Sequence, residues 1–152
     1  MSVEARLAAL GLALPGPPQP VGNYVPAARV GDLVFTSGQT ARLDGVRRYV
    51  GMVGREVTPE DAYHSARDAT LNCLACVKLL VGDLERVARV VKVVGFVNCV
   101  EGYERLSEIV DGASDLLEML FGARGRHVRS TIGLRALPSN VSVEIELVVQ
   151  VT

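Results

Sequence analysis

Two segments near the C-terminus alternate apolar and polar side chains, and they constrain the fold more strongly than any other feature of the sequence. The segments cover residues 128–136 and 141–151, and the short turn Leu-Pro-Ser-Asn separates them at 137–140. A period of two is typical of β-strands whose two faces meet different surroundings. We therefore expect a β-sheet with one apolar face in this part of the chain.

The alternation also predicts which side chains lie away from the core. In the later segment, valine, isoleucine and leucine occupy every second position, so Glu144 and Glu146 fall on the opposite face. In the earlier segment the apolar set includes Val128 and Ile132, which places Arg129 on the face away from the core. We therefore expect Arg129 and Glu144 to lie on the same side of the sheet.

Two other segments have the three- and four-residue spacing of apolar side chains that indicates an amphipathic helix. The first begins at Thr58, which can cap a helix, is followed by proline at the first helical position, and ends at Gly82. The second covers residues 106–120, but Gly112 weakens it in the middle, so a helix that begins only there is an open alternative.

The remaining strands are predicted from β-branched runs. Residues 87–98 are apolar on both faces, which indicates a central strand that is covered on both sides. Residues 24–30 and 33–37 flank Gly31-Asp32 and predict a hairpin, and residues 48–52 could add a short strand. The order of elements predicts an α+β fold in which two helices cover one face of a sheet.

The composition narrows the class of protein. Of the 152 residues, 49% are hydrophobic, and 16 basic residues balance 17 acidic ones for a net charge of −1. A scattered, balanced charge argues against binding to nucleic acid or to an anionic membrane surface. No secretory leader is visible, and the three cysteines do not indicate a disulfide framework, so we expect a soluble cytoplasmic protein.

The N-terminal region differs from the rest of the chain. Residues 3–12 predict a short helix, and residues 14–20 are too rich in proline and glycine for regular structure. We interpret residues 1–21 as an arm that leads into a single domain formed by residues 22–152.

Arg129 and Glu144 are the side chains that could carry chemistry. An arginine fork holds a carboxylate with two parallel hydrogen bonds, and a nearby glutamate can position water or move a proton. A monomer could also leave these charges in water, where they need no function, and the pattern alone leaves both interpretations open. Apolar residues on both faces of 87–98 favour burial of the second face in a symmetric oligomer.

Other candidates have simpler interpretations. Cys73 and Cys76 have redox spacing but lie in mid-helix, where packing in the core explains them better. His64 and His127 lack the spacing of metal ligands, so we expect no metal site. The Ser-Gly-Gln run at 37–39 could offer backbone donors to a ligand or could form a plain turn.

Several segments resemble the reactive-intermediate deaminases, the Rid or YjgF family. The most specific are Arg129-Ser130, Leu137-Pro138 and the Glu-Ile-Glu run at 144–146. The other matching segments, in family order from residue 22 onward, are Gly-Asn-Tyr-Val-Pro-Ala (22–27), Gly-Asp-Leu-Val-Phe-Thr-Ser-Gly-Gln (31–39) and Arg-Val-Val-Lys-Val-Val-Gly-Phe-Val (89–97).

The resemblance implies a chorismate-mutase-like fold of about six strands and two helices, assembled as a homotrimer around a central barrel. It implies hydrolysis of 2-imino or 2-enamino acids to 2-keto acids and ammonia without a cofactor. Arg129 would hold the substrate carboxylate, and Glu144 would position the attacking water. The remaining pocket residues implied by the resemblance are Tyr24, Ser37, Gly38, Gln39, Ser130 and Thr131.

The chain departs from the best-characterised deaminases in ways that mark a separate subgroup. It has Asn23 and Val25-Pro26 around Tyr24, His127-Val128 before Arg129, and the N-terminal arm. A trimer that binds a keto acid without turnover is therefore the alternative function. Some family members are described as endoribonucleases or translation inhibitors, a role that the balanced charge of this chain supports least.

Overall fold

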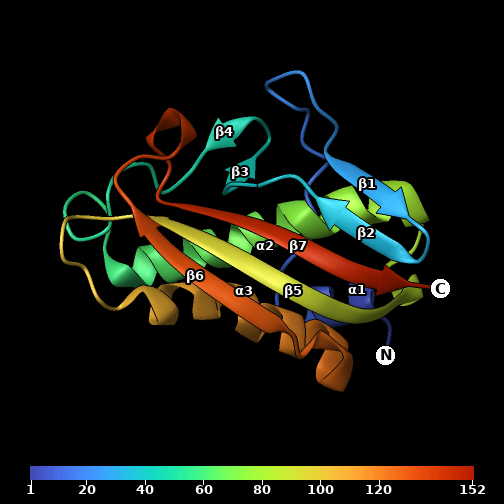
Figure 1. Cartoon of the computed structure of the whole chain (residues 1–152). Helices are drawn as coiled ribbons and strands as arrows, with labels where there is room; N and C mark the ends of the chain where they lie inside the picture. The colour runs from blue at the N-terminus through green and yellow to red at the C-terminus, as the bar shows by residue number, and fades with distance from the viewer.

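The computed structural model describes the whole chain, residues 1–152. A five-stranded mixed sheet has the strand order β1-β2-β7-β5-β6, and β3 and β4 form a separate two-stranded sheet (Figure 1). The strands are β1 (Ala27–Val30), β2 (Leu33–Thr36), β3 (Arg42–Leu43), β4 (Val46–Arg47), β5 (Val87–Asn98), β6 (Val128–Leu134) and β7 (Val143–Val151). The helices are α1 (Val3–Ala9), α2 (Pro59–Val81) and α3 (Leu106–Phe121).

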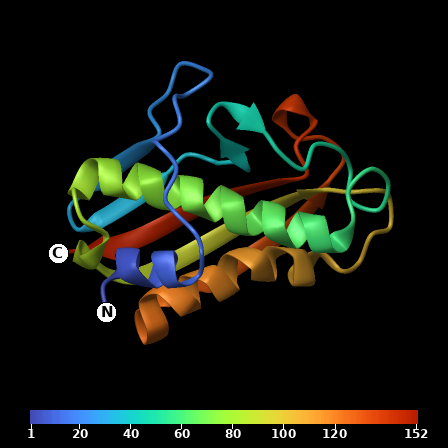
Figure 2. The same cartoon turned by 180° about the vertical axis from the view of Figure 1, so that it is seen from behind.

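The predicted α+β fold is confirmed. Helices α2 and α3 pack side by side against one face of the five-stranded sheet, and α1 lies beside them at the end near the C-terminus (Figure 2). The opposite face of the sheet carries no helix. The sheet itself has one strand fewer than the resemblance implies, because β3 and β4 pair only with each other.

Helix α2 begins and ends where the local sequence predicts. The Thr58 hydroxyl accepts a hydrogen bond from the Asp61 N–H at 3.1 Å, which satisfies one of the free donors of the first turn. At the other end Gly82 adopts φ 83°, a conformation that suits glycine best. Cys73 and Cys76 are free and buried in the middle of this helix, as expected for core packing.

Helix α3 is continuous through Gly112, so it does not begin there. A methyl group added at Gly112 would lie 2.0 Å from the carbonyl oxygen of Tyr63 on α2. The two helices therefore approach so closely at this point that only glycine fits. The glycine that weakened the helix prediction is explained by helix–helix packing rather than by a helix end.

The strand expected at 48–52 is wrong. The pairing segment lies just upstream, where β3 and β4 form a hairpin around Asp44 and Gly45, both with positive φ. An Asp-Gly pair with this geometry is a strong signal for a two-residue hairpin turn. Residue Val50 makes only an isolated bridge to Val141.

The face prediction is correct for β7 and wrong for β6. On β7 the side chains of Val143, Ile145, Leu147, Val149 and Val151 are all buried against the helices. On β6, however, Val128 is 65% exposed and Ile132 42% exposed, on the face without helices. Register explains this: Arg129 is aligned with Val93 and Leu147, which face the helices, whereas Glu144 is aligned with Phe96 and Ile132 on the open face.

The arm is tied to the rest of the chain by its helix. Val3 and Leu7 of α1 belong to the hydrophobic core, and the Arg6 guanidinium donates a hydrogen bond of 2.7 Å to the carbonyl of Leu120 on α3. Residues 14–20 follow without regular structure, as predicted. None of the helices has the length and apolar character that crossing a membrane requires.

The close approach of the two helices at Gly112 can be tested by substitution. We expect Gly112→Ala to lower the free energy of unfolding by about 1–3 kcal/mol or more, because the added methyl group forces α2 and α3 apart. Urea unfolding measures the change. Met119→Ala is the control, since Met119 lies 48% exposed on the same helix and its loss should change stability by less than about 0.5 kcal/mol. An unchanged Gly112→Ala variant would contradict the packing described here.

Candidate functional site

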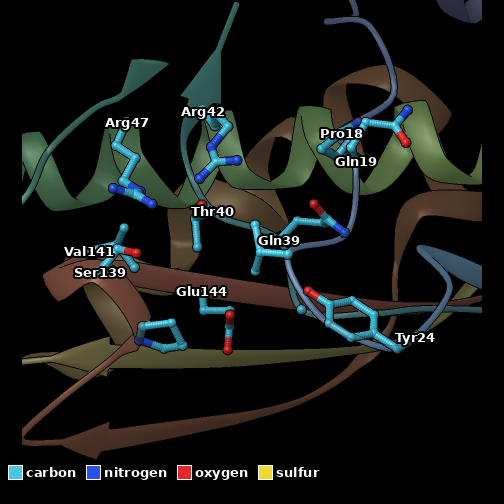
Figure 3. Close-up of a pocket in the computed structure, with 13 residues that line it drawn as sticks. Pro18, Gln19, Tyr24, Gln39, Thr40, Arg42, Arg47, Ser139, Val141 and Glu144 are labelled. Carbon is cyan, nitrogen blue, oxygen red and sulfur yellow. The ribbon is translucent and has the colours of Figure 1, made fainter. Parts of the chain in front are cut away.

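A small polar cavity lies on the rim of the sheet, between the β3–β4 hairpin, the Tyr24 loop and the start of β7 (Figure 3). Its volume is about 100 Å³. This volume is well above the roughly 10–15 Å³ that a single water needs, so the cavity can admit a small ligand. Pro18 and Gln19 of the arm form part of its wall. The arm therefore contributes directly to the site.

The floor of the cavity is built by a two-way backbone bridge. The N–H of Gln39 donates to the carbonyl of Ile145 at 2.8 Å, and the N–H of Ile145 donates back to Gln39 at 2.9 Å. This bridge places Gly38 directly over the side chain of Glu144. A methyl group at Gly38 would lie 2.7 Å from the carboxyl carbon of Glu144, so glycine is required for the carboxyl group to occupy its position.

Glu144 is the acidic side chain of the cavity. It is partly buried, and no protein group donates a hydrogen bond to it. Burial, and to a lesser degree the charge of Glu146 two residues along the same face, raises the pKa of Glu144 above its usual value. A raised pKa makes the ionised carboxyl group a better acceptor for a proton, which suits general acid–base catalysis.

Tyr24 closes another side of the cavity. Its hydroxyl points toward the Glu144 side (Figure 3). Ser37 does not line the cavity but holds this loop in place: its hydroxyl donates to the carbonyl of Val25 at 2.6 Å, and its N–H donates to the carbonyl of Pro26 at 2.8 Å. Ser37 is therefore a support for the Tyr24 loop in this structure.

The Ser-Gly-Gln run offers fewer free donors than its sequence suggests. The N–H groups of Ser37 and Gln39 are already used inside the chain. The N–H groups of Gly38 and Thr40 donate no hydrogen bond to the protein, and both residues line the cavity. These two groups are backbone donors that a ligand in the cavity could use.

Arg129 does not line the cavity, and the expectation that it shares a face with Glu144 is wrong. Its guanidinium turns to α3, where one terminal nitrogen donates to Asp111 at 2.8 Å and to Ser114 at 2.9 Å. The other donates to the hydroxyl of Ser107 at 2.7 Å and to its carbonyl at 3.2 Å. Four of the five N–H groups of the side chain are thus engaged with the helix.

His127 extends this network. Its Nδ1 lies 2.6 Å from the carbonyl oxygen of Gly125, which can only accept, so in the neutral ring Nδ1 carries the hydrogen. Nε2 then accepts a hydrogen bond from the hydroxyl of Ser114 at 2.9 Å. Ser114 in turn accepts from Arg129, and the chain of bonds fixes the orientation of the guanidinium.

The two other predicted residues of β6 also lie outside the cavity. Ser130 is exposed on the open face, aligned with Val94, and Thr131 points to the helix side, aligned with Gly95. The sequence analysis missed Arg42 and Arg47, which do line the cavity. The Asp-Gly turn between them would have revealed that the two arginines lie opposite each other.

We found no group of three or more histidine, cysteine, aspartate or glutamate side chains placed to hold a metal ion. All three cysteines are buried. Burial raises the pKa of the Cys76 thiol to about 11, which disfavours the reactive thiolate. The groups available for chemistry in the cavity include the Glu144 carboxyl, the Tyr24 hydroxyl, two backbone N–H groups and two guanidinium groups.

Comparison with known proteins agrees with this architecture. Residues 4–150 match the family described as "YjgF/chorismate_mutase-like, putative endoribonuclease". The chain is 35% identical over 149 residues to protein TCP17 of Trypanosoma cruzi, covering 97% of this chain and 93% of that protein. It is 30% identical over 139 residues to a 2-iminobutanoate/2-iminopropanoate deaminase of Dermatophagoides farinae, covering 91% and 93%.

A solved structure of "a putative endoribonuclease" from Shewanella oneidensis superimposes with a TM-score of 0.96 at 35% identity. The match covers 99% of this chain and 100% of that one, so the N-terminal arm has a counterpart there. The chain belongs to the YjgF/chorismate mutase-like family.

The close approach of Gly38 to Glu144 generates a first prediction for the site. We expect Gly38→Ala to change the free energy of unfolding by less than about 1 kcal/mol, because the obstructed group is the end of a flexible side chain. The carboxyl group should be pushed into the cavity water, and its pKa should fall toward the usual value for glutamate. A ¹³C NMR titration of the Glu144 carboxyl measures this shift. Gly16→Ala, where an added methyl group meets no atom, is the control.

The raised pKa of Glu144 generates a second prediction. Because the folded chain keeps this proton to a higher pH than the unfolded chain, it binds more protons between the two pKa values, and the free energy of unfolding falls as the pH rises through that range. We therefore expect the difference in free energy of unfolding, Glu144→Gln minus parent, to be larger at pH 8 than at pH 4. Urea unfolding at both pH values measures the difference. If the difference in free energy of unfolding is the same at both pH values, the pKa of Glu144 is not raised by folding.

Proposed function

We propose that the chain is a hydrolytic deaminase of 2-imino and 2-enamino acids, which it converts to 2-keto acids and ammonia. The observation that carries the proposal is a single glutamate, Glu144, with a raised pKa inside a small polar cavity. The relative of Dermatophagoides farinae, whose name describes this activity, supports the choice of reaction. Imine hydrolysis needs mainly positioning and proton transfer, which these groups can supply.

The reaction can be written with the groups of the cavity. Water adds to C2 of the protonated imine while Glu144 accepts one of its protons, and the electron pair of the C=N bond moves to nitrogen. Glu144 then returns the proton to nitrogen, and the C–N bond breaks as the hydroxyl oxygen forms the C=O bond. The hydroxyl proton passes to Glu144 and from there to the departing ammonia. The products are a 2-keto acid and ammonium. An enamine enters the same path after it accepts a proton at C3.

The assigned role of Arg129, holding the substrate carboxylate, requires a second copy of the chain. Arg129 and Glu144 face opposite sides of one sheet, so only Arg129 of a neighbouring copy could reach the cavity. Arg129 lies on the edge strand β6, which has no partner on its outer side. The apolar residues of the open face, including Phe35, Val128 and Ile132, support an assembly that buries them. We therefore keep the homotrimer as part of the proposal.

The arm fits this proposal as a fixed wall of the site. Pro18 and Gln19 line the cavity, and α1 anchors the arm to α3. We therefore describe residues 1–21 as an extension that narrows the site and residues 22–152 as the domain that carries it. The small volume of the cavity, about 100 Å³, also favours a small acid over RNA.

Rates of imine hydrolysis test the proposal. Amino-acid oxidases that generate 2-iminobutanoate and 2-iminopropanoate in the assay would supply the substrates, and keto acid formation would be followed against the uncatalysed rate. We expect the parent to accelerate hydrolysis and Glu144→Gln to lose about 10²–10⁴-fold in kcat. We expect Arg129→Ala to lose about 10²-fold in kcat/KM, because two charge-assisted hydrogen bonds to the carboxylate are removed.

Arg126→Ala is the matched control for Arg129. It removes the same charge three residues away, from a side chain that is 76% exposed and paired with Glu118, and it should keep full activity. The oligomeric state of each variant must match the parent. A parent that does not accelerate any imine would overturn the proposal. Binding of 2-oxobutanoate without turnover would favour the alternative, a trimer that binds keto acids without catalysis.

A further inference from the structure

The β3–β4 hairpin beside the cavity is held firmly in place. Asn72 of α2 is 2% exposed, and its side-chain amide donates to the carbonyls of Thr40 and Arg42, both at 2.8 Å. The hairpin turn at Asp44 and Gly45 uses two positive φ angles, 50° and 78°. The backbone that carries Arg42 and Arg47 is therefore fixed before any ligand binds.

The hairpin places two like charges side by side. Arg42 and Arg47 are direct cross-strand partners in the register of β3 and β4. Like charges in directly opposed positions destabilise a strand pair. Neither guanidinium forms an ion pair in the structure, whereas the neighbouring Arg48 and Arg67 both pair with Asp68. The two arginines therefore have no carboxylate partner within the protein.

Arg42 also has an unsatisfied donor. Its Nε is buried and has no hydrogen-bond partner. Leaving a buried donor without a partner costs free energy, and charged groups cost more than neutral ones. A bound anion between the two arginines would offset the repulsion, because a carboxylate accepts hydrogen bonds from two guanidinium groups.

Both arginines face the same cavity as Glu144 but do not bind it. Figure 3 shows Arg42 and Arg47 on the hairpin side of the cavity, with Glu144 across from them beyond Thr40. No ion pair joins either arginine to Glu144. The cavity therefore separates a cationic wall from the carboxyl group that the proposed reaction uses.

We propose that Arg42 and Arg47 bind a second, distal carboxylate of the substrate, so that the site takes imines of four- and five-carbon dicarboxylic amino acids. This substrate class rests on the proposed function, since Glu144 carries out the hydrolysis. The distal carboxylate does not react, and the product keeps both acid groups. The stable product 2-oxoglutarate keeps both carboxylates and serves as a binding probe.

We call the pair Arg42 and Arg47 the arginine clamp. Calorimetry with 2-oxoglutarate, 2-oxobutanoate and inorganic phosphate tests this clamp directly. We expect the parent to bind 2-oxoglutarate at least about tenfold more tightly than either other ligand. Arg47→Gln should remove that preference; Arg47 is exposed, so its replacement should not disturb the fold. Arg48→Gln is the matched control, because Arg48 is the next residue but pairs with Asp68 outside the cavity, and it should keep the preference. Phosphate that binds as tightly as 2-oxoglutarate would overturn the clamp in favour of a general anion site.

Turnover separates the two proposals. We expect the ratio of kcat/KM for 2-iminoglutarate to that for 2-iminobutanoate to exceed one in the parent and to fall by about tenfold or more in Arg47→Gln. If the parent hydrolyses 2-iminobutanoate but Arg47→Gln leaves the ratio of the two kcat/KM values unchanged, the clamp is overturned and the proposed deaminase activity is retained. Binding of 2-oxoglutarate that depends on Arg47, without hydrolysis of any imine, would support the clamp and overturn the deaminase.

Discussion

Strand β7 is the element on which both the core and the site depend. It pairs with β2 on one side and with the long strand β5 on the other, and its inward side chains fill the core under both helices. At its start, the two-way bridge between Gln39 and Ile145 joins the loop after β2 to the strand. The alternation along β7 then gives Glu144 a fixed position on the opposite face, directly beneath Gly38.

The site has a stability cost that follows from this arrangement. A carboxyl group that is partly buried without a hydrogen-bond donor is less stable when ionised, and the neighbouring Glu146 adds to the penalty. The two opposed arginines and the buried, unpaired Nε of Arg42 add a second cost in stability. Unfavourable contacts concentrated in one small cavity are typical of functional sites, where a ligand supplies the missing partners. The well-packed core elsewhere in the chain offsets them.

Arg129 and the two cavity arginines differ in how their guanidinium groups are paired within the chain. Its hydrogen bonds to Ser107, Asp111 and Ser114 join β6 to α3, so within one chain it acts as a structural link. To bind a substrate in an assembly, Arg129 would have to give up some of its hydrogen bonds to α3 and form bonds to the substrate in their place. The side chains of Arg42 and Arg47, in contrast, form no ion pair within the chain. This difference is visible only once the side chains are placed.

Much of the fold could be predicted from local patterns in the sequence. Helices α2 and α3, the strands β5 and β7, the β1–β2 hairpin and the core-facing side of β7 all follow from local periodicity, caps and turn residues. Glu144, Gly38 and Gln39 were site candidates in the sequence, the family resemblance added Tyr24, and all four line one cavity. Local patterns succeed here because each element buries one consistent face or ends at a residue with a clear backbone preference.

Local patterns could not predict which side of the sheet each β6 residue faces or which arginines reach the cavity. The alternation on β6 defines two faces but not which one meets the helices, because Val128 and Ile132 lie on the open side while α3 supplies polar partners for Arg129. Register with β5 settles the question, and register depends on residues far away in the chain. The placement of Arg42 and Arg47 likewise depends on how the hairpin docks against Asn72, a contact between segments about thirty residues apart.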